Sequence, residues 1–227
     1  MSGRLAVIGL GPGDARYLTA EAQAALADAE ALYGYGGYLD RVPLRAGQAR
    51  HASDNREESA RAAAVCEAIA QGPPQWRALE LAVVPGVTAM LAVAARVGAP
   101  LGHDFCALSL SDNLKPWELI ERRLDAAAKA GFVIALYNPI SRARPWQLGK
   151  AFERLRALLP GETAVVFGRA IGRADESMRV TTLAAAEPSA ADMATLIIIG
   201  SPETHVIERP GRAPLVYTSR SAKVACP

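Results

Sequence analysis

Five short loops of this sequence carry glycine or polar residues directly after an apolar run. They are GLGPGD (9–14), VPGVTAM (84–90), SLSDN (109–113), YNPISRARPW (137–146) and FGRAIGR (167–173). In an open α/β sheet, ligands bind beyond the carboxyl ends of the strands. If each apolar run is a strand of such a sheet, the loops converge on one cleft and are the first candidates for a binding site.

The first loop has glycine at positions 9, 11 and 13. It lacks the G-K-[ST] ending of a Walker loop, and its spacing differs from the dinucleotide pattern G-x-G-x-x-G. Pro12 removes an N–H that would otherwise be free to face a phosphate. Gly11 and Gly13 therefore either let a large flat ligand or a cofactor approach the main chain, with Asp14 beside it, or serve only a tight turn.

The loop at 137–146 has the most unusual composition. Asn138-Pro139 ends a wholly apolar run, and Arg142, Arg144 and Trp146 follow it. An amide, two guanidiniums and an indole at a strand end suit an anionic, conjugated ligand. A solvated loop with a core tryptophan is the alternative interpretation.

Other polar side chains in these loops also have two interpretations each. Asp112 is a candidate acid or base, or part of a helix N-cap. Thr88 caps the following helix or bonds a ligand. Arg169 and Arg173 hold carboxylates with their planar guanidiniums, or are ordinary surface arginines.

The composition is that of an α/β protein with a sizeable core. The chain has 227 residues, of which 51% are hydrophobic and 21% charged, and its net charge is +2. At about 150 residues per domain, it forms one large domain or two small ones. The near balance of charges argues against a protein that coats nucleic acid.

The three cysteines and three histidines are scattered along the chain. They predict neither a disulfide framework nor a zinc site, so no metal is expected. The N-terminus lacks an apolar core of signal-peptide length, and no run approaches the roughly 20 apolar residues that span a membrane. We therefore expect a cytoplasmic protein with no membrane or nucleic-acid partner.

Short β-branched runs alternate with helical stretches, which is typical of parallel sheets with crossover helices. The strand runs are apolar on both faces and are expected to be buried on both sides. The stretch RVGAPLGHDF (96–105) separates two sets of elements. We predict two small αβα domains with largely parallel sheets, residues 1–102 and 103–227, and an active-site cleft between them.

Local signals place several helix ends. Thr19 is the expected N-cap of a helix over residues 19–30. The cap residues that begin at Ser53 open a second helix, and Gly72 closes it. Gly131 closes a third helix in the second half of the chain.

The segments GLGPGD, VVPGVTA, ALYNP, FGRA and TLIIIG, in this order, resemble the tetrapyrrole methylases. These are the S-adenosylmethionine-dependent enzymes of corrin and siroheme synthesis. The stretches SLSDNLKPWELIERRL and ALYNPISRARPWQLGKAF resemble one branch, which methylates the ring and contracts it in cobalamin synthesis. The resemblance implies the fold of that family, S-adenosylmethionine as cofactor with S-adenosylhomocysteine as its product, a tetrapyrrole substrate and a homodimer.

The resemblance also implies site residues, position by position. Those that match the cofactor site are Pro12, Thr88, Ala89, Tyr137 and Leu196. Those that match the tetrapyrrole side are Gly11, Gly13, Asp14, Ser109, Asp112, Asn138 and Arg169. Bare glycine backbone suits a flat macrocycle, and arginine suits its acetate and propionate rim.

The expected reaction requires alignment of the reactants and transfer of protons. Alignment of the methyl group with the ring carbon can supply most of the acceleration of methyl transfer. Ring contraction also moves protons, so a general acid or base is expected. Asp112 and His103 are the candidates for that role.

One family feature is missing from the sequence. The family has a strand and a G-D-P-G loop that should lie between Arg61 and Val65, and no G-D-P triplet occurs here. That loop helps to hold the cofactor in the family. A strand-sized void would cost about 24 cal/mol per Å³, so we expect the flanking strands to pair again into a smaller first sheet. A family member acting at a different ring position and a non-catalytic tetrapyrrole-binding protein remain alternatives.

Overall fold

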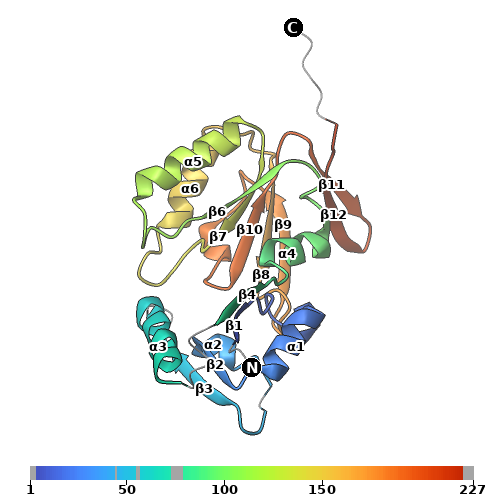
Figure 1. The fold of residues 1–227 in the computed structure, drawn as a ribbon. Coiled ribbons are helices and arrows are strands. Elements are labelled where there is room, and N and C mark those ends of the chain that lie inside the picture. The colour runs from blue at the N-terminus through green and yellow to red at the C-terminus, as the bar shows by residue number, and fades with distance from the viewer. Residues whose placement is uncertain (1–3, 44, 55–56, 73–78, 222–227) are drawn as a thin grey trace. The chain divides into compact units, whose positions relative to one another are not determined.

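The computed structural model describes residues 4–43, 45–54, 57–72 and 79–221 (Figure 1). The fold is α/β, as predicted. Its contacts divide the chain into two compact units, Met1–Val87 and Thr88–Pro227. This division lies earlier in the chain than the predicted boundary at 102/103.

The second unit begins early because helix α4 (Ala89–Val97) packs on its strands. A Cβ atom at Gly168 would lie 2.3 Å from Cγ2 of Val93, so only a glycine lets this helix lie directly on the sheet. The short strand β5 (Gly98–Ala99) follows α4 and pairs with β12 (Arg212–Thr218). The Gly- and Pro-containing stretch thus lies inside the second unit rather than between the units.

Five strands form the main sheet of the second unit, in the order β6-β7-β10-β8-β9. Their bounds are Phe105–Ser109 for β6, Val133–Tyr137 for β7, Thr195–Ile199 for β10, Ala164–Arg169 for β8 and Ser177–Thr182 for β9. Strands β6 and β7 are parallel, whereas β10 is antiparallel to β7 and β8, and β9 is antiparallel to β8. The prediction of a largely parallel sheet is wrong for this unit, because strands buried on both faces show no alternation that reports direction.

The core of the second unit lies between this sheet and two amphipathic helices. Helices α5 (Trp117–Lys129) and α6 (Gln147–Arg156) bury one face each against alternate strand residues. Phe152 of α6 meets Phe167 of β8 edge to face, with ring centroids 6.2 Å apart. Gly131 has a φ of 75° just beyond α5 and ends the helix as predicted.

A smaller three-stranded sheet completes the second unit, in the order β11-β12-β5. Strand β11 (Thr204–Arg209) is antiparallel to β12. The buried hydroxyl of Thr218 donates to the carbonyl oxygen of Pro100 at 2.6 Å. This bond ties the chain after β5 to the end of β12. A 3-10 turn, η3 (Pro188–Ala190), lies between β9 and β10.

The first unit contains two separate pairs of parallel strands. Strand β1 (Arg4–Ile8) pairs with β4 (Glu80–Val84), and β2 (Ala31–Tyr35) pairs with β3 (Ala49–Ser53). Its helices are α1 (Ala20–Asp28), α2 (Gly36–Leu39) and α3 (Glu58–Gln71), with a 3-10 turn η1 (Ala15–Tyr17).

In the first unit, the capping residues in the sequence predict helix ends more accurately than the sequence predicts strands. Thr19 caps α1 by accepting from the Ala22 N–H at 3.1 Å, as predicted. Gly72 ends α3, also as predicted. Ser53, however, ends strand β3 rather than opening the helix, which begins at Glu58.

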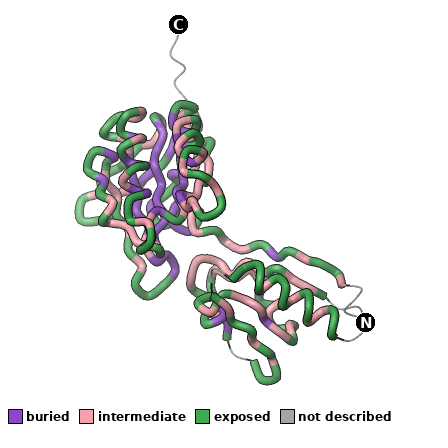
Figure 2. The backbone as a smooth tube through the Cα atoms, turned by 90° about the vertical axis from the view of Figure 1, so that its left-hand side faces the viewer, coloured by how far each residue is buried: buried purple, intermediate pink, exposed green. Residues whose placement is uncertain are grey.

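Among the described residues, the two strand pairs of the first unit do not join into one sheet. The predicted re-pairing is therefore wrong. Leu81 and Val83 of β4 are 66% and 72% exposed, and α3 buries none of its residues. Buried residues concentrate in the second unit, while the first is mostly intermediate or exposed (Figure 2).

Candidate functional site

Four strands of the second unit place predicted site residues along one edge of the main sheet. Strands β6, β7 and β8 end there, and the antiparallel β10 begins there. The register pairs Ser109 with Tyr137, and Thr195 with Arg169. The chain segments chosen from the sequence in this unit therefore do meet, apart from the one that contains His103.

The ends of β6 and β7 are joined by a side-chain hydrogen bond. The Asn138 amide donates from Nδ2 to Oγ of Ser109 at 2.9 Å. The N–H of Ser111 donates to the same hydroxyl oxygen at 3.3 Å. Asn138 has a φ of 50°, a left-handed conformation that asparagine tolerates better than most residues. These contacts fix the amide at the strand end, where the sequence placed a substrate contact.

The Asp112 carboxylate is an acceptor between two loops. Nε of Arg144 lies 2.7 Å from its Oδ1, and the buried Gln147 donates to the same oxygen from Nε2 at 2.9 Å. Arg144 also donates to the side-chain oxygen of Asn113. The carboxylate therefore holds the loop after β6 against the loop after β7. Its role as a general acid or base stays a prediction.

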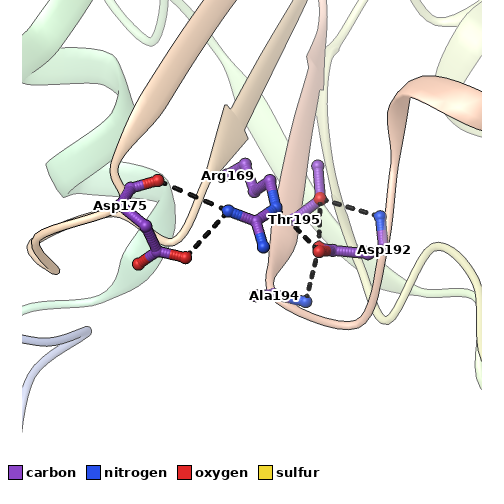
Figure 3. A network of polar contacts seen from close by, with 5 residues as sticks. All are labelled: Arg169, Asp175, Asp192, Ala194 and Thr195. Atoms are coloured by element: carbon purple, nitrogen blue, oxygen red, sulfur yellow. Dashed lines mark hydrogen bonds and ion pairs between the residues drawn. The ribbon is translucent and has the colours of Figure 1, made fainter.

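Arg169, a predicted substrate residue, is engaged by two carboxylates (Figure 3). Its Nε donates to Oδ2 of Asp192 at 2.7 Å, and a terminal nitrogen donates to Oδ2 of Asp175 at 2.9 Å. Asp192 further accepts from the Thr195 hydroxyl at 2.8 Å and from the Ala194 N–H at 2.9 Å. The guanidinium thus connects the end of β8 to the start of β10.

This network changes the ionisation of its members. The hydrogen bonds to Asp175 and Asp192 raise the pKa of Arg169. The bond from Arg169 lowers the pKa of the Asp175 carboxyl. Burial opposes ionisation of Asp192, but bonds from Thr195, Arg169 and the Ala194 N–H outweigh it and lower the pKa of that carboxyl. Both acids are therefore held as carboxylates, and a substrate role for Arg169 stays a prediction.

Several predicted cofactor residues lie together at the amino end of α4. Thr88 caps the helix by accepting from the Leu91 N–H at 3.4 Å, and Ala89 is its first residue. The hydroxyl of Tyr137 accepts from the Met90 N–H at 3.2 Å and fixes this end of the helix to β7. Leu196 is buried in the neighbouring strand β10.

The glycine loop of the first unit packs against its own chain. A Cβ atom on Gly9 would lie 2.5 Å from the N atom of Gly86, so these glycines let two loops touch backbone to backbone. Gly11 has a φ of 68°, and a Cβ there would meet Cβ of Tyr17 at 2.8 Å. Close packing explains both glycines without a ligand, and their approach to one stays a prediction.

The rest of this loop is also held internally. Asp14 caps η1 by accepting from the Arg16 N–H at 2.8 Å, while Pro12 and Gly13 are partly buried in the turn. Arg41, which the sequence did not single out, donates to the carbonyl oxygens of Leu10 at 3.1 Å and Gly11 at 2.6 Å.

The two predicted catalytic residues lie at opposite ends of β6. His103 precedes the strand, and its Nδ1 accepts from the Asp104 N–H at 2.6 Å. Asp112 follows the strand. At about 3.3 Å per residue, the strand between them is too long for the two side chains to act on one bond. The structure therefore does not bring them together.

Three residues that organise these loops were not predicted, and each has a partner distant in sequence. Arg41 bonds the glycine loop, Gln147 bonds Asp112, and Asp192 bonds Arg169. A glutamine in the first turn of a helix, in line with its apolar face, was a usable sequence signal for Gln147. Nothing in the sequence near Arg41 marks it.

Among the described residues, no group of three or more His, Cys, Asp or Glu residues is placed to hold a metal ion. Within the same ranges, none of the helices combines the length and apolar character needed to cross a membrane.

Comparison with known proteins gives consistent matches over nearly the whole chain. A precorrin-3B C(17)-methyltransferase from a Sinorhizobium species is 58% identical over 247 aligned positions, which cover 97% of each chain. A probable cobalt-factor III C(17)-methyltransferase from Salmonella typhimurium is 36% identical and covers 94% of this chain and 99% of that protein. The crystal structure of the methyltransferase CobJ has a TM-score of 0.88 at 38% identity, over 96% of this chain and 100% of that one.

The first of these alignments is longer than the chain itself. Its 247 positions exceed the 227 residues here, so the Sinorhizobium enzyme carries residues that this chain lacks. The family described as Tetrapyrrole (Corrin/Porphyrin) Methylases matches residues 4–73 and 73–187. On these matches, the chain belongs to the tetrapyrrole methylase family.

Proposed function

We propose that this protein is an S-adenosylmethionine-dependent precorrin-3B C(17)-methyltransferase of cobalamin biosynthesis, with ring contraction accompanying methylation. The observation that carries the proposal is the 58% identity, over 97% of both chains, to an enzyme of that name. A cytoplasmic location and a homodimer belong to the same proposal.

The residues at the amino end of α4 have side chains of the types that could bind the cofactor. Thr88 and Tyr137 bring hydroxyl groups to this helix end, and the helix dipole there favours a carboxylate such as that of the methionine moiety. Leu196 adds an apolar neighbour on β10. The residues that would hold the cofactor are Thr88, Ala89, Tyr137 and Leu196. When bound, the cofactor supplies a methyl group attached to a good leaving group.

The side chains at the sheet edge would bind and orient the tetrapyrrole. The Ser109–Asn138 pair presents a fixed amide, and the bonds to Asp112 keep both neighbouring loops in place. Fixed positions matter because well-oriented reactants gain effective molarities of about 10⁵–10⁸ M. The proton transfers of ring contraction still need an acid or base, for which Asp112 remains the candidate at this edge.

Incubation of the purified chain with precorrin-3B and methyl-labelled S-adenosylmethionine tests the activity. We expect one label per product, and mass spectrometry would identify the ring-contracted compound. Cobalt-factor III is assayed in parallel, because the Salmonella relative at 36% identity carries that name. Faster turnover of the cobalt compound would contradict the substrate assignment.

The missing residues support a second candidate, a tetrapyrrole-binding protein without catalysis. The Sinorhizobium enzyme carries residues that this chain lacks, and the first unit has two unjoined strand pairs among its described residues. Calorimetric titration with S-adenosylmethionine separates the candidates. Binding with methyl transfer supports the enzyme, and tetrapyrrole binding with no cofactor binding supports the second candidate.

A further inference from the structure

The loops after β6 and β7 form a connected surface that we call the two-loop platform, residues 109–117 and 137–147. Side-chain contacts join them, namely Ser109 with Asn138, Asp112 with Arg144, Asn113 with Arg144, Asp112 with Gln147, and the indoles of Trp117 and Trp146. The indole centroids lie 4.8 Å apart at an angle of 76°. The buried Leu110 donates its N–H to the Tyr137 carbonyl at 2.9 Å and holds the first loop down.

The charges of the platform are unevenly compensated. The Asp112 carboxylate forms an ion pair with Arg144, and the two loops contain no other acidic residue. Arg142 stands in the turn between Ser141 and Arg144, which pair as an isolated antiparallel bridge. Within the described part of the chain, neither Arg142 nor Lys115 has an ion pair or side-chain hydrogen bond. The platform therefore carries two uncompensated cations.

Exposed apolar side chains accompany these cations. Leu114, next to Lys115, is 94% exposed, and Trp146, in the same loop as Arg142, is 42% exposed. A single exposed apolar residue needs no explanation. Here each one accompanies an uncompensated cation on loops that are otherwise fixed by internal bonds. An apolar surface edged by cations is complementary to a flat ring edged by carboxylates.

We propose that Lys115 and Arg142 bind peripheral carboxylates of the tetrapyrrole, while Leu114 and Trp146 contact its ring. This inference rests on the proposed function and names the residues that recognise its substrate. It differs from the assignment made from the sequence, which gave the carboxylates to Arg169. That guanidinium is already bound to Asp175 and Asp192, whereas Arg142 has no ion-pair partner among the described residues.

Charge removal on the platform tests the proposal. The variants Lys115→Gln and Arg142→Gln should each raise the KM for precorrin-3B about fivefold, and the double variant about 30-fold. kcat and the Kd for S-adenosylmethionine should stay within about twofold, because the described bonds at the α4 end involve neither residue. The salt dependence of kcat/KM should also weaken in the double variant, since salt screens exposed charges.

Matched controls separate charge at the platform from charge in general. Arg122→Gln removes an exposed arginine on α5, outside the platform, and should leave the KM unchanged. Arg142→Lys keeps the charge and should recover most of the affinity. An unchanged KM in the double variant overturns the proposal, as does equal loss in the Arg122 control.

Failure of the proposed function would look different. If the wild-type chain does not methylate precorrin-3B, binding of uroporphyrin III, a carboxylate-edged tetrapyrrole, is followed by fluorescence instead. Weaker binding by the double variant than by wild type supports the platform in that case. Equal binding by both proteins overturns it.

Discussion

Helices α3 and α6 show how differently the two units are packed. Helix α6 buries Leu148, Ala151, Phe152 and Leu155 against the main sheet, whereas the longer α3 buries no residue. The sheet next to α6 is continuous over five strands, while the described residues of the first unit form two unjoined pairs. A helix gains stability from the apolar area it can cover, and α3, which lies against β2, buries no residue there.

The arginines of the two units differ in part in their partners. In the second unit Arg154 donates to Asp125 at 2.8 Å and Arg169 binds Asp175 and Asp192, whereas Arg156 and Arg209 donate to backbone carbonyls. In the first unit Arg41 and Arg50 donate to loop carbonyls. The first unit therefore holds its loops with bonds from side chain to backbone where a larger apolar core would serve. The comparison predicts that substitutions affect the two units differently.

The largest effect is expected in the core of the second unit. Phe152→Ala removes a fully buried ring that meets Phe167, so it should lower the free energy of unfolding by about 3–5 kcal/mol. Val65→Ala on α3, where no residue is buried, should change it by less than about 0.5 kcal/mol. Urea denaturation measures both variants, and similar losses would show that the packing difference between the units is not real.

A side chain at Gly11 should disturb the first unit locally. Gly11→Val places a Cβ 2.8 Å from Cβ of Tyr17 at a φ of 68°, and the combined clash and strain should cost about 1–3 kcal/mol. We also expect turnover to be lost, because this loop is predicted to cover the tetrapyrrole. Hydrogen exchange across residues 9–17 should report the loosened loop.

Gly47 provides the control for backbone strain alone. It has a φ of 78°, and apart from its chain neighbours no heavy atom of the described residues lies within 4 Å of a Cβ built there. Gly47→Ala should therefore cost about 1 kcal/mol and leave turnover unchanged. Normal turnover by the Gly11→Val variant would show that the glycine loop serves only as a turn.

Restoring the missing segment should bring the first unit closer to the second. A strand and G-D-P-G loop inserted between Arg61 and Val65 would offer a partner for the unjoined strands and cover apolar residues such as Val83. We expect the affinity for S-adenosylmethionine to rise at least about tenfold, or about 1.4 kcal/mol. An insertion of the same length made of Gly and Ser is the control, and equal affinities would show that the segment does not support cofactor binding.

The smallest effect is expected from acid titration of the Arg169 network. Asp175 and Asp192 have lowered pKa values in the folded state, so their contribution to stability is present above the unfolded pKa of about 3.9. It is lost as the pH falls through the folded values. Arg169→Lys should flatten the pH dependence of unfolding in this window without altering stability near pH 7 strongly, because the network is largely exposed.

The same Arg169→Lys variant tests the sequence-based assignment of this residue to the substrate. Loss of the planar guanidinium should weaken tetrapyrrole binding and spare S-adenosylmethionine binding if Arg169 contacts substrate carboxylates. If affinity for both ligands falls equally, Arg169 acts only by connecting β8 to β10.

Much of the local structure could be predicted because its causes lie close together in sequence. Thr19 and Thr88 cap helices whose N–H groups are three residues away. Gly72 and Gly131 follow directly on the last turns of α3 and α5, so the glycine itself marks the helix end in the sequence. The order of the strand-end loops was also enough to indicate the family and most residues at the sheet edge. The apolar strands showed no comparable signal for direction, so the antiparallel β9 and β10 were missed.

The sequence by itself determined where several helices end and which loops gather chemically useful side chains. Only the tertiary structure decided which of those side chains are held by distant partners. Arg169 and Asp192, or Asp112 and Gln147, are far apart in the chain and meet because β8 and β10, or β6 and α6, are packed together. The same holds for Gly9 and Gly86, whose small size is needed because two loops touch. Local propensity acts over a few residues, whereas charge pairing and close backbone contact depend on the packing of distant elements.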